Sequence, residues 1–172
     1  MGDRMLTYID PETINKPFSR YSHVVAAPET CRWAHISGQV GVNRDGDILD
    51  GFEAQARQTW ANVLHALRAA GMGLDDIVKT TTYLTRREDI PASRAVRDEA
   101  LQGRAPAATL VIVSGLADPA LLLEIEVIAA QPAAAGRAAA PKARGKAKAK
   151  TKTKTKAKAK AKARPKAKAK RR

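Results

Sequence analysis

The fold of this chain is decided by residues 104–130, which read RAPAATLVIVSGLADPALLLEIEVIAA. Two runs in this stretch, 109–113 and 121–130, are rich in branched apolar residues and predict β-strands. Ser114, Gly115, Asp118 and Pro119 stand between the runs and are typical of turns. We therefore expect two largely buried strands joined by a loop.

The second of these strands carries two carboxylates. Because side chains alternate along a strand, Glu124 and Glu126 share one side with Leu122 and Ile128. The opposite side is wholly apolar and consists of Leu121, Leu123, Ile125, Val127 and Ala129. A buried carboxylate is costly unless it is paired or hydrogen-bonded, so the two glutamates either line a wet cleft or meet partners from elsewhere in the chain. An exposed or ion-paired surface is an equally good interpretation.

The composition changes abruptly near Gln131. Residues 1–130 hold 13 basic and 17 acidic residues, a net charge of −4, whereas residues 131–172 hold 18 basic residues and no acidic one. About 130 residues suffice for one compact domain, but the last 42 residues contain too few apolar side chains to fold alone. We therefore predict a folded domain over 1–130 and a disordered basic tail over 131–172.

Before residue 104 the chain alternates predicted strands with two predicted helices. Strands are predicted over 5–9, 24–27, 32–37 and 77–84. A helix is predicted over 50–70, with Asp50 as its N-cap, Glu53 completing a capping box and Gly71 ending it. Its apolar stripe consists of Phe52, Ala56, Trp60, Val63, Leu64 and Leu67, and the residues off that stripe are Gln55, Arg57, Asn62 and Arg68.

A second, weakly apolar helix is predicted from Glu88 to Gly103, with Pro91 in its first turn. Its inward residues are expected to be Ala92, Ala95, Val96 and Ala100. The order of the elements predicts an α+β fold in which a single sheet carries two helices on one face. The other face of that sheet would then need a partner subunit.

Metal, disulfide and membrane roles find no support in the sequence. Cys31 is the only cysteine, which excludes an intrachain disulfide and a cysteine zinc cluster, and we expect it to be a core thiol. His23 and His35 are too isolated to predict a metal site, and no metal or cofactor is expected. No apolar run is long enough to cross a bilayer and no signal peptide is recognisable, so we expect a cytoplasmic protein without membrane contact.

A series of short motifs runs through residues 5–130. They are Tyr21-Ser22-His23, Ser37-Gly38-Gln39, FEAQARQ at 52–58, Asn62-Val63, Ala69-Ala70-Gly71, DDIVKTT at 75–81, Pro106-Ala107 and Glu124-Ile125-Glu126 with Ile128-Ala129. In this order and spacing they resemble the RidA/YjgF family, small proteins of the chorismate-mutase-like α+β fold that assemble as homotrimers. The resemblance implies that three sheets close into a barrel-like assembly with three equivalent clefts between subunits.

Active members of this family hydrolyse reactive enamines and imines to a keto acid and ammonia without a cofactor. The resemblance therefore implies an enamine/imine deaminase with a small-molecule imine or enamine as its substrate. It assigns Tyr21 to the cleft, Ser37 and Gly38 to backbone contacts with the substrate, and Glu124 to the catalytic carboxylate that positions or deprotonates water. A partly desolvated carboxylate can hold a water and pass a proton to the departing nitrogen.

The chain departs from the family where the substrate carboxylate is bound. Active deaminases carry Arg in the third place of a Pro-Ala-Arg-Ser/Thr motif, whereas this chain reads Pro106-Ala107-Ala108-Thr109. A bidentate Arg contact to a carboxylate is stronger than a neutral hydrogen bond, so its loss at Ala108 argues against an amino-acid-derived imine. Thr109 remains a candidate substrate-binding residue, and Arg94 and Arg104 are the two nearby cations that could replace the missing guanidinium.

The tail alternates Lys with Ala or Thr, which resembles the tails of linker histones and of bacterial histone-like proteins. Pro132, Pro141 and Pro165, together with repulsion between the lysines, favour disorder. The tail has no aromatic residue and no apolar face, so what remains is sequence-independent attraction to DNA or RNA. The residues expected to make these contacts are Lys146, Lys148, Lys150, Lys152, Lys154, Lys156, Lys158, Lys160, Lys162, Lys166, Lys168 and Lys170. A merely solubilising extension is the alternative.

Two functions remain open from the sequence. The first is a homotrimeric RidA-like deaminase with an atypical substrate, which its tail tethers to nucleic acid and so associates with the nucleoid. The second is a non-catalytic protein that binds small ligands or, in the manner of a histone-like protein, nucleic acid, and uses the fold to trimerise three tails.

Overall fold

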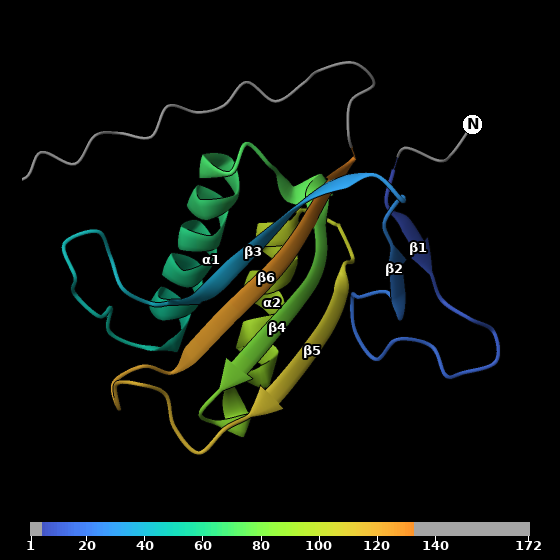
Figure 1. Ribbon diagram of the computed structural model, residues 1–172. Helices are drawn as coiled ribbons and strands as arrows, with labels where there is room; N and C mark the ends of the chain where they lie inside the picture. Colours follow the sequence, from blue (N-terminus) through green and yellow to red (C-terminus); the bar gives the residue numbers. More distant parts are fainter. Residues whose placement is uncertain (1–4, 133–172) are drawn as a thin grey trace, which may run out of the picture. The chain divides into compact units, whose positions relative to one another are not determined.

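The structure, a computed structural model, describes residues 5–132 (Figure 1). It is an α+β domain with six strands and two α-helices, as the sequence predicts. The strands are β1 (Thr7–Ile9), β2 (Val24–Ala26), β3 (Cys31–Val40), β4 (Ile77–Leu84), β5 (Ala107–Ile112) and β6 (Leu123–Pro132), and the helices are α1 (Phe52–Ala69) and α2 (Ile90–Leu101). Two short 3-10 turns, Leu74–Asp76 and Arg87–Asp89, precede β4 and α2.

Four of the strands form the main sheet in the order β3-β6-β4-β5. β6 runs antiparallel to both of its neighbours, and β5 runs parallel to β4, to which α2 connects it. The two strands of residues 104–130 are therefore present but are not adjacent, because β4 lies between them. The loop between them carries the chain from the edge of the sheet to its interior.

Both helices cover the same face of this sheet, and Figure 1 views the sheet from the opposite, open face. The alternation predicted for β6 is confirmed, since the side chains of Leu123, Ile125, Val127 and Ala129 are all buried beneath the helices. Trp60, Val63 and Leu67 of α1 and Val96 and Leu101 of α2 complete the core. The apolar side of one central strand thus supplies one half of the core and the helices supply the other.

β1 and β2 form a two-stranded sheet of their own and do not extend the main sheet. The expectation of one sheet is corrected in this respect, while the fold class stands. The break lies between Ala26 and Cys31, where Pro28 has no N–H to donate to a strand ladder. Cys31 follows this turn, and its Sγ donates a hydrogen bond of 3.2 Å to the Pro28 carbonyl. It is only partly buried, so the prediction of a core thiol is wrong.

The start of α1 differs from the prediction. Its N-cap is Gly51 at a φ of 79°, and no side chain caps the helix, so Asp50 does not form the expected capping box. Glycine adopts this positive φ more readily than any other residue, so Gly51 serves as the N-cap and the helix begins after Asp50. The other end agrees with the prediction, because Gly71, at a φ of 68°, follows the last turn.

Gln55 was expected to lie off the apolar stripe of α1, and this is wrong. Its side chain is buried and fully hydrogen-bonded. The amide donates to the carbonyls of Leu49 and Ala120, each at 2.9 Å, and accepts a hydrogen bond of 2.9 Å from the Leu122 N–H. Periodicity cannot identify such a residue, because two of the partners that make its burial favourable, Ala120 and Leu122, lie 65 and 67 positions away in the sequence.

The inward face of α2 also differs from the prediction, because Ala95 is exposed. The buried residues of this helix are Ser93, Val96, Arg97 and Leu101. Arg97 keeps its charge paired by donating two hydrogen bonds to Asp98, at 3.0 and 2.8 Å. Alanine is small and helix-compatible on either face, so a run of alanines does not determine how a helix is rotated.

β6 runs through Gln131 to Pro132, past the domain boundary expected at residue 130. Gln131 belongs to the domain by its contacts, since its side-chain oxygen accepts a hydrogen bond of 2.7 Å from Arg32. The predicted disordered tail and its lysines lie outside the described residues. Within residues 5–132, no helix has both the length and the apolar character needed to span a bilayer.

Candidate active site on the open face of the sheet

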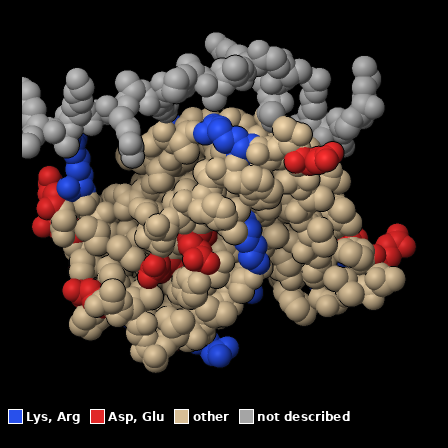
Figure 2. Space-filling view, in the orientation of Figure 1, with Lys and Arg blue, Asp and Glu red and all other residues tan. Residues whose placement is uncertain are grey.

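The face of the sheet that the helices leave uncovered carries the candidate site. Figure 2 shows a small group of acidic side chains over this face and scattered basic ones. The strand register aligns the outward residues in rows, so that Tyr83 of β4 pairs with Glu124 of β6, and Thr81 of β4 pairs with both Glu126 and Thr109. Glu124, Glu126, Tyr83 and Thr109 therefore point to the same side of the sheet.

Glu124 packs directly against the backbone of Gly38. A Cβ added at Gly38 would overlap the Glu124 side chain, with the carboxyl carbon only 2.6 Å away. The register of β3 against β6 shifts between Ile36 and Gln39, and this irregularity brings Ser37 and Gly38 to the site. The glycine is thus required by close approach. The structure thus places Gly38 against Glu124, although the two are far apart in the sequence, whereas Ser37 lines a hollow with Glu126.

Glu126 has a hydrogen-bond partner on the neighbouring strand. The Tyr83 hydroxyl donates to Glu126 Oε1 at 3.2 Å. Burial, then the hydrogen bond to Glu126 and the negative charges of Glu126 and Glu124, raise the pKa of Tyr83 above its ordinary value. The phenol is therefore a protonated hydrogen-bond donor at neutral pH.

Both carboxylates line a hollow of 450 Å³ on this face. Its other lining residues are Tyr83 and, from the loop after β5, Val113, Gly115, Leu116 and Ala117. A second, smaller hollow of 210 Å³ lies on the other side of Glu126 and includes Ser37 and His35. The larger hollow has the volume of a small-ligand site.

Thr109 lies on the same face but at its edge. Its hydroxyl accepts a hydrogen bond of 2.5 Å from the Lys79 ammonium group. Ala108, for which the resemblance led us to expect a carboxylate-binding Arg, pairs with the buried Thr80 and lies on β5, two strands away from Glu124. No guanidinium therefore projects from the edge strand at this position.

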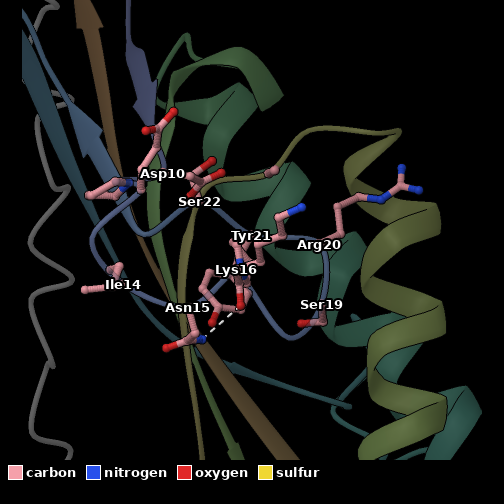
Figure 3. A pocket seen from close by; sticks show the side chains of 12 residues that line it. Asp10, Ile14, Asn15, Lys16, Ser19, Arg20, Tyr21 and Ser22 are labelled. Carbon is pink, nitrogen blue, oxygen red and sulfur yellow. Dashed lines mark hydrogen bonds between the residues drawn. The ribbon is translucent and has the colours of Figure 1, made fainter.

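Tyr21 lines a different hollow, of 680 Å³, formed by the loop between β1 and β2 (Figure 3). In Figure 3 it lies among Asn15, Lys16, Ser19 and Arg20. The loop is fixed to the segment just before β5 by a hydrogen bond of 3.0 Å from the Ser22 N–H to the Ala105 carbonyl. Within one chain, Tyr21 and Glu124 thus line separate hollows.

The two cations considered as replacements for the missing Arg do not share the face of Glu124. Arg104 donates a hydrogen bond of 2.6 Å to Asp75, and this contact holds the pKa of the Asp75 carboxyl below its usual range. Arg94 is exposed on α2, a helix of the layer that covers the other face of the sheet. In residues 5–132 no three potential metal-ligating side chains gather into one group.

Sequence reasoning missed Tyr83, Lys79 and the wall that the loop after β5 contributes. Tyr83 was placed in a strand, but its contact with Glu126 depends on the order of strands in the sheet. The alternation of Lys79, Thr81 and Tyr83 along β4 is the one signal that places them on a common side. That alternation does not indicate which strand lies next to β4.

The fold and the site together define the class of protein. It is an α+β domain with two helices on one face of a sheet and, on the other face, a strand carboxylate packed against a glycine backbone beside a small hollow. The family model described as Endoribonuclease L-PSP matches residues 13–131 of the chain. The chain belongs to the RidA/YjgF family.

Relatives of known sequence and structure support this assignment. A RutC family protein of Pyrococcus horikoshii is 34% identical over 127 residues, which cover 73% of this chain and 98% of that protein. The mouse protein named 2-iminobutanoate/2-iminopropanoate deaminase is 33% identical over 113 residues, which cover 64% of this chain and 81% of that protein. The crystal structure of a Rid family protein from Yersinia pestis has a TM-score of 0.66 and 35% identity, covering 72% of this chain and 97% of that one.

Proposed function

We propose that this chain is a RidA-like hydrolase that converts a reactive imine or enamine to a carbonyl compound and ammonia. The observation that carries the proposal is the position of Glu124, which packs against Gly38 and lines the 450 Å³ hollow. Relatives from a dust mite, mouse and rat are named 2-iminobutanoate/2-iminopropanoate deaminase, which supports the reaction class.

In the proposed reaction Glu124 acts as a general base and then as a general acid. Its carboxylate accepts a proton from a water whose oxygen attacks the carbon of the protonated imine, which gives a neutral carbinolamine. When the carbon–nitrogen bond breaks, Glu124 returns the proton to the departing nitrogen, and ammonia and the carbonyl compound are released. Such proton transfers typically accelerate a reaction by about 10²–10⁴-fold, and they need no cofactor.

The substrate is proposed to lack the usual carboxylate. Ala108 offers no guanidinium, Arg104 is engaged by Asp75, and Arg94 is on the helix side. A carboxylate entering the hollow would also meet Glu124 and Glu126, and like charges repel.

An imine hydrolysis assay tests the catalytic role of Glu124 directly. The full chain should release ammonia and carbonyl product from freshly generated imines faster than buffer does, and Glu124→Gln should remove that acceleration. Glu29→Gln is the matched control, because Glu29 is an exposed turn residue far from the hollow in sequence and absent from its lining. Equal rates for wild type and Glu124→Gln would refute the catalytic assignment.

A homotrimer is proposed as the working form. The open face exposes Trp33 by 50% and Val111 by 39%, and such an apolar face is stabilised by a partner. A site shared between subunits would also allow Tyr21 of one chain to contribute to the hollow of another. Sedimentation of residues 1–132 should give a trimer at micromolar concentration. A stable monomer would contradict both statements.

The basic tail is proposed to bind DNA or RNA without sequence preference. Residues 131–172 hold 18 basic and no acidic residues, whereas the rest of the chain has a net charge of −4 and should repel phosphate. If about 8 phosphates are neutralised at once, log affinity should fall with log salt at a slope of roughly −7 for duplex DNA. This tail is also the basis of the rival function, in which the domain only trimerises three tails.

Titration at several salt concentrations decides whether the tail accounts for binding. Full-length protein should bind DNA strongly in dilute salt and residues 1–132 should not. Equal affinities of the two, or a slope near zero, would return the tail to a solubilising extension. If the tail binds DNA but Glu124→Gln does not change imine hydrolysis, the rival function is favoured.

A further inference from the structure

Glu126 has no part in the proton transfers proposed for Glu124, yet it lines the same hollow. Among residues 5–132, the charged side chains that line this hollow are Glu124 and Glu126 alone. Neither forms an ion pair with a Lys, Arg or His in the part of the chain that the structure describes. The hollow therefore has a negative potential that the domain itself does not neutralise.

Tyr83 holds Glu126 in place. Its hydroxyl donates to Oε1, which fixes the carboxylate against β4, and this is the one hydrogen bond that the Glu126 side chain makes within residues 5–132. The other oxygen is left to accept a bond from a ligand. The raised pKa of Tyr83 is consistent with this arrangement, since a neutral phenol donates to the carboxylate and does not compete with it for a cation.

Lys79 is a cation on the same face, and it lies at the far end of that face. It donates to Thr109 on the edge strand and is four positions from Tyr83 along β4, which corresponds to about 13 Å. It does not line the hollow. The carboxylate pair and the ammonium group are thus separate features of the surface.

We infer that Glu126, held by Tyr83, is a specificity-determining residue that selects a positively charged imine lacking a carboxylate. This inference rests on the proposed function and names its substrate class. The balanced reaction is R₂C=NH₂⁺ + H₂O → R₂C=O + NH₄⁺, in which the water oxygen bonds to carbon and the nitrogen leaves with the electron pair of the broken bond. Glu126 stabilises the iminium charge while Glu124 moves the proton. A 2-imino acid brings a carboxylate of its own, which both glutamates repel.

Two imines that differ by one carboxylate test the inference. Propan-1-imine, generated by oxidation of propylamine, has the carbon skeleton of 2-iminobutanoate without its carboxylate. The full chain should show a kcat/KM at least about tenfold higher for propan-1-imine, because a charge-assisted contact is worth about one decade or more. Glu126→Gln should reduce that preference through KM more than kcat, Tyr83→Phe should reduce it less, and Glu29→Gln should leave it unchanged.

Binding provides a readout that does not depend on turnover. Calorimetric titration of the full chain with propylammonium and with butanoate should show that the cation binds more tightly and that Glu126→Gln weakens it about tenfold. Hydrolysis of both imines with no preference for propan-1-imine, or a preference unchanged in Glu126→Gln, would overturn the inference and leave the proposed function standing. Hydrolysis of neither imine would overturn the proposed function. Butanoate binding at least as tight as propylammonium would overturn the inference in either case.

Discussion

Replacing Gln55 by Leu should show how the helix layer holds the strand that carries the site. The Gln55 amide joins three segments, since it donates to Leu49 and Ala120 and accepts from Leu122. The last two contacts fix the chain immediately before Glu124. Leu has a similar volume but can make none of these bonds, so the change removes the contacts without opening a large cavity.

The expected cost follows from the three bonds. Each contributes a net of about 1 kcal/mol, and the two carbonyls and one N–H left in a partly buried region add to the loss. Burial of the more apolar Leu side chain returns about 1 kcal/mol. The free energy of unfolding should therefore fall by about 2–3 kcal/mol, which corresponds to a decrease in Tm of roughly 10 °C for a domain of this size.

The assay is urea denaturation of the full chain at one fixed protein concentration, because the stability of an oligomer depends on concentration. Gln58→Leu is the matched control, since Gln58 is in the same helix, is only partly buried and makes one hydrogen bond, to Asn62. It should cost less than about 1 kcal/mol. A Gln55→Leu variant no less stable than Gln58→Leu would refute the stabilising role of the three Gln55 hydrogen bonds.

Three further predictions concern the site and its support. Gly38→Ala places a methyl group where the Glu124 carboxylate lies and should lower imine hydrolysis on the order of 100-fold. Gly73→Ala is the control, because a Cβ at Gly73 meets no atom within 4 Å. Equal activities of the two variants would contradict the close approach of Gly38 and Glu124. Arg32→Ala removes the hydrogen bonds to the Ala70 and Gly71 carbonyls at the end of α1 and to Gln131, and should lower the unfolding free energy by about 1–2 kcal/mol in thermal melts. Arg68→Ala, in the last turn of α1 itself, should cost less. The folded pKa of Tyr83 lies above its unfolded value, so the stability that Tyr83 contributes is fully present below the unfolded pKa and is lost as pH rises through the folded pKa. Phenolate absorbance should show one tyrosine that titrates above the ordinary range and that is absent in Tyr83→Phe. An unchanged titration curve in Tyr83→Phe would contradict the contact with Glu126.

Local patterns in the sequence determined most of the elements. The strand over 77–84 has the predicted bounds, and the stripe of α1 correctly identified Trp60, Val63 and Leu67 as core. The alternation of β6 correctly separated its buried apolar side from the side of Glu124 and Glu126. These predictions succeed because the period of a helix or a strand depends only on residues within a few positions of one another. The resemblance of short motifs correctly gave the family.

Tertiary structure decided which distant residues meet. Gln55 is buried because carbonyls from Leu49 and Ala120 converge on it, and Glu126 meets Tyr83 because β4 and not β5 lies next to β6. The same strand order leaves Arg104 with Asp75 and brings Gly38 against Glu124. None of this follows from periodicity, since a hydrogen bond or a close approach between segments depends on the order, direction and register of strands, and these are set by the packing of the whole core.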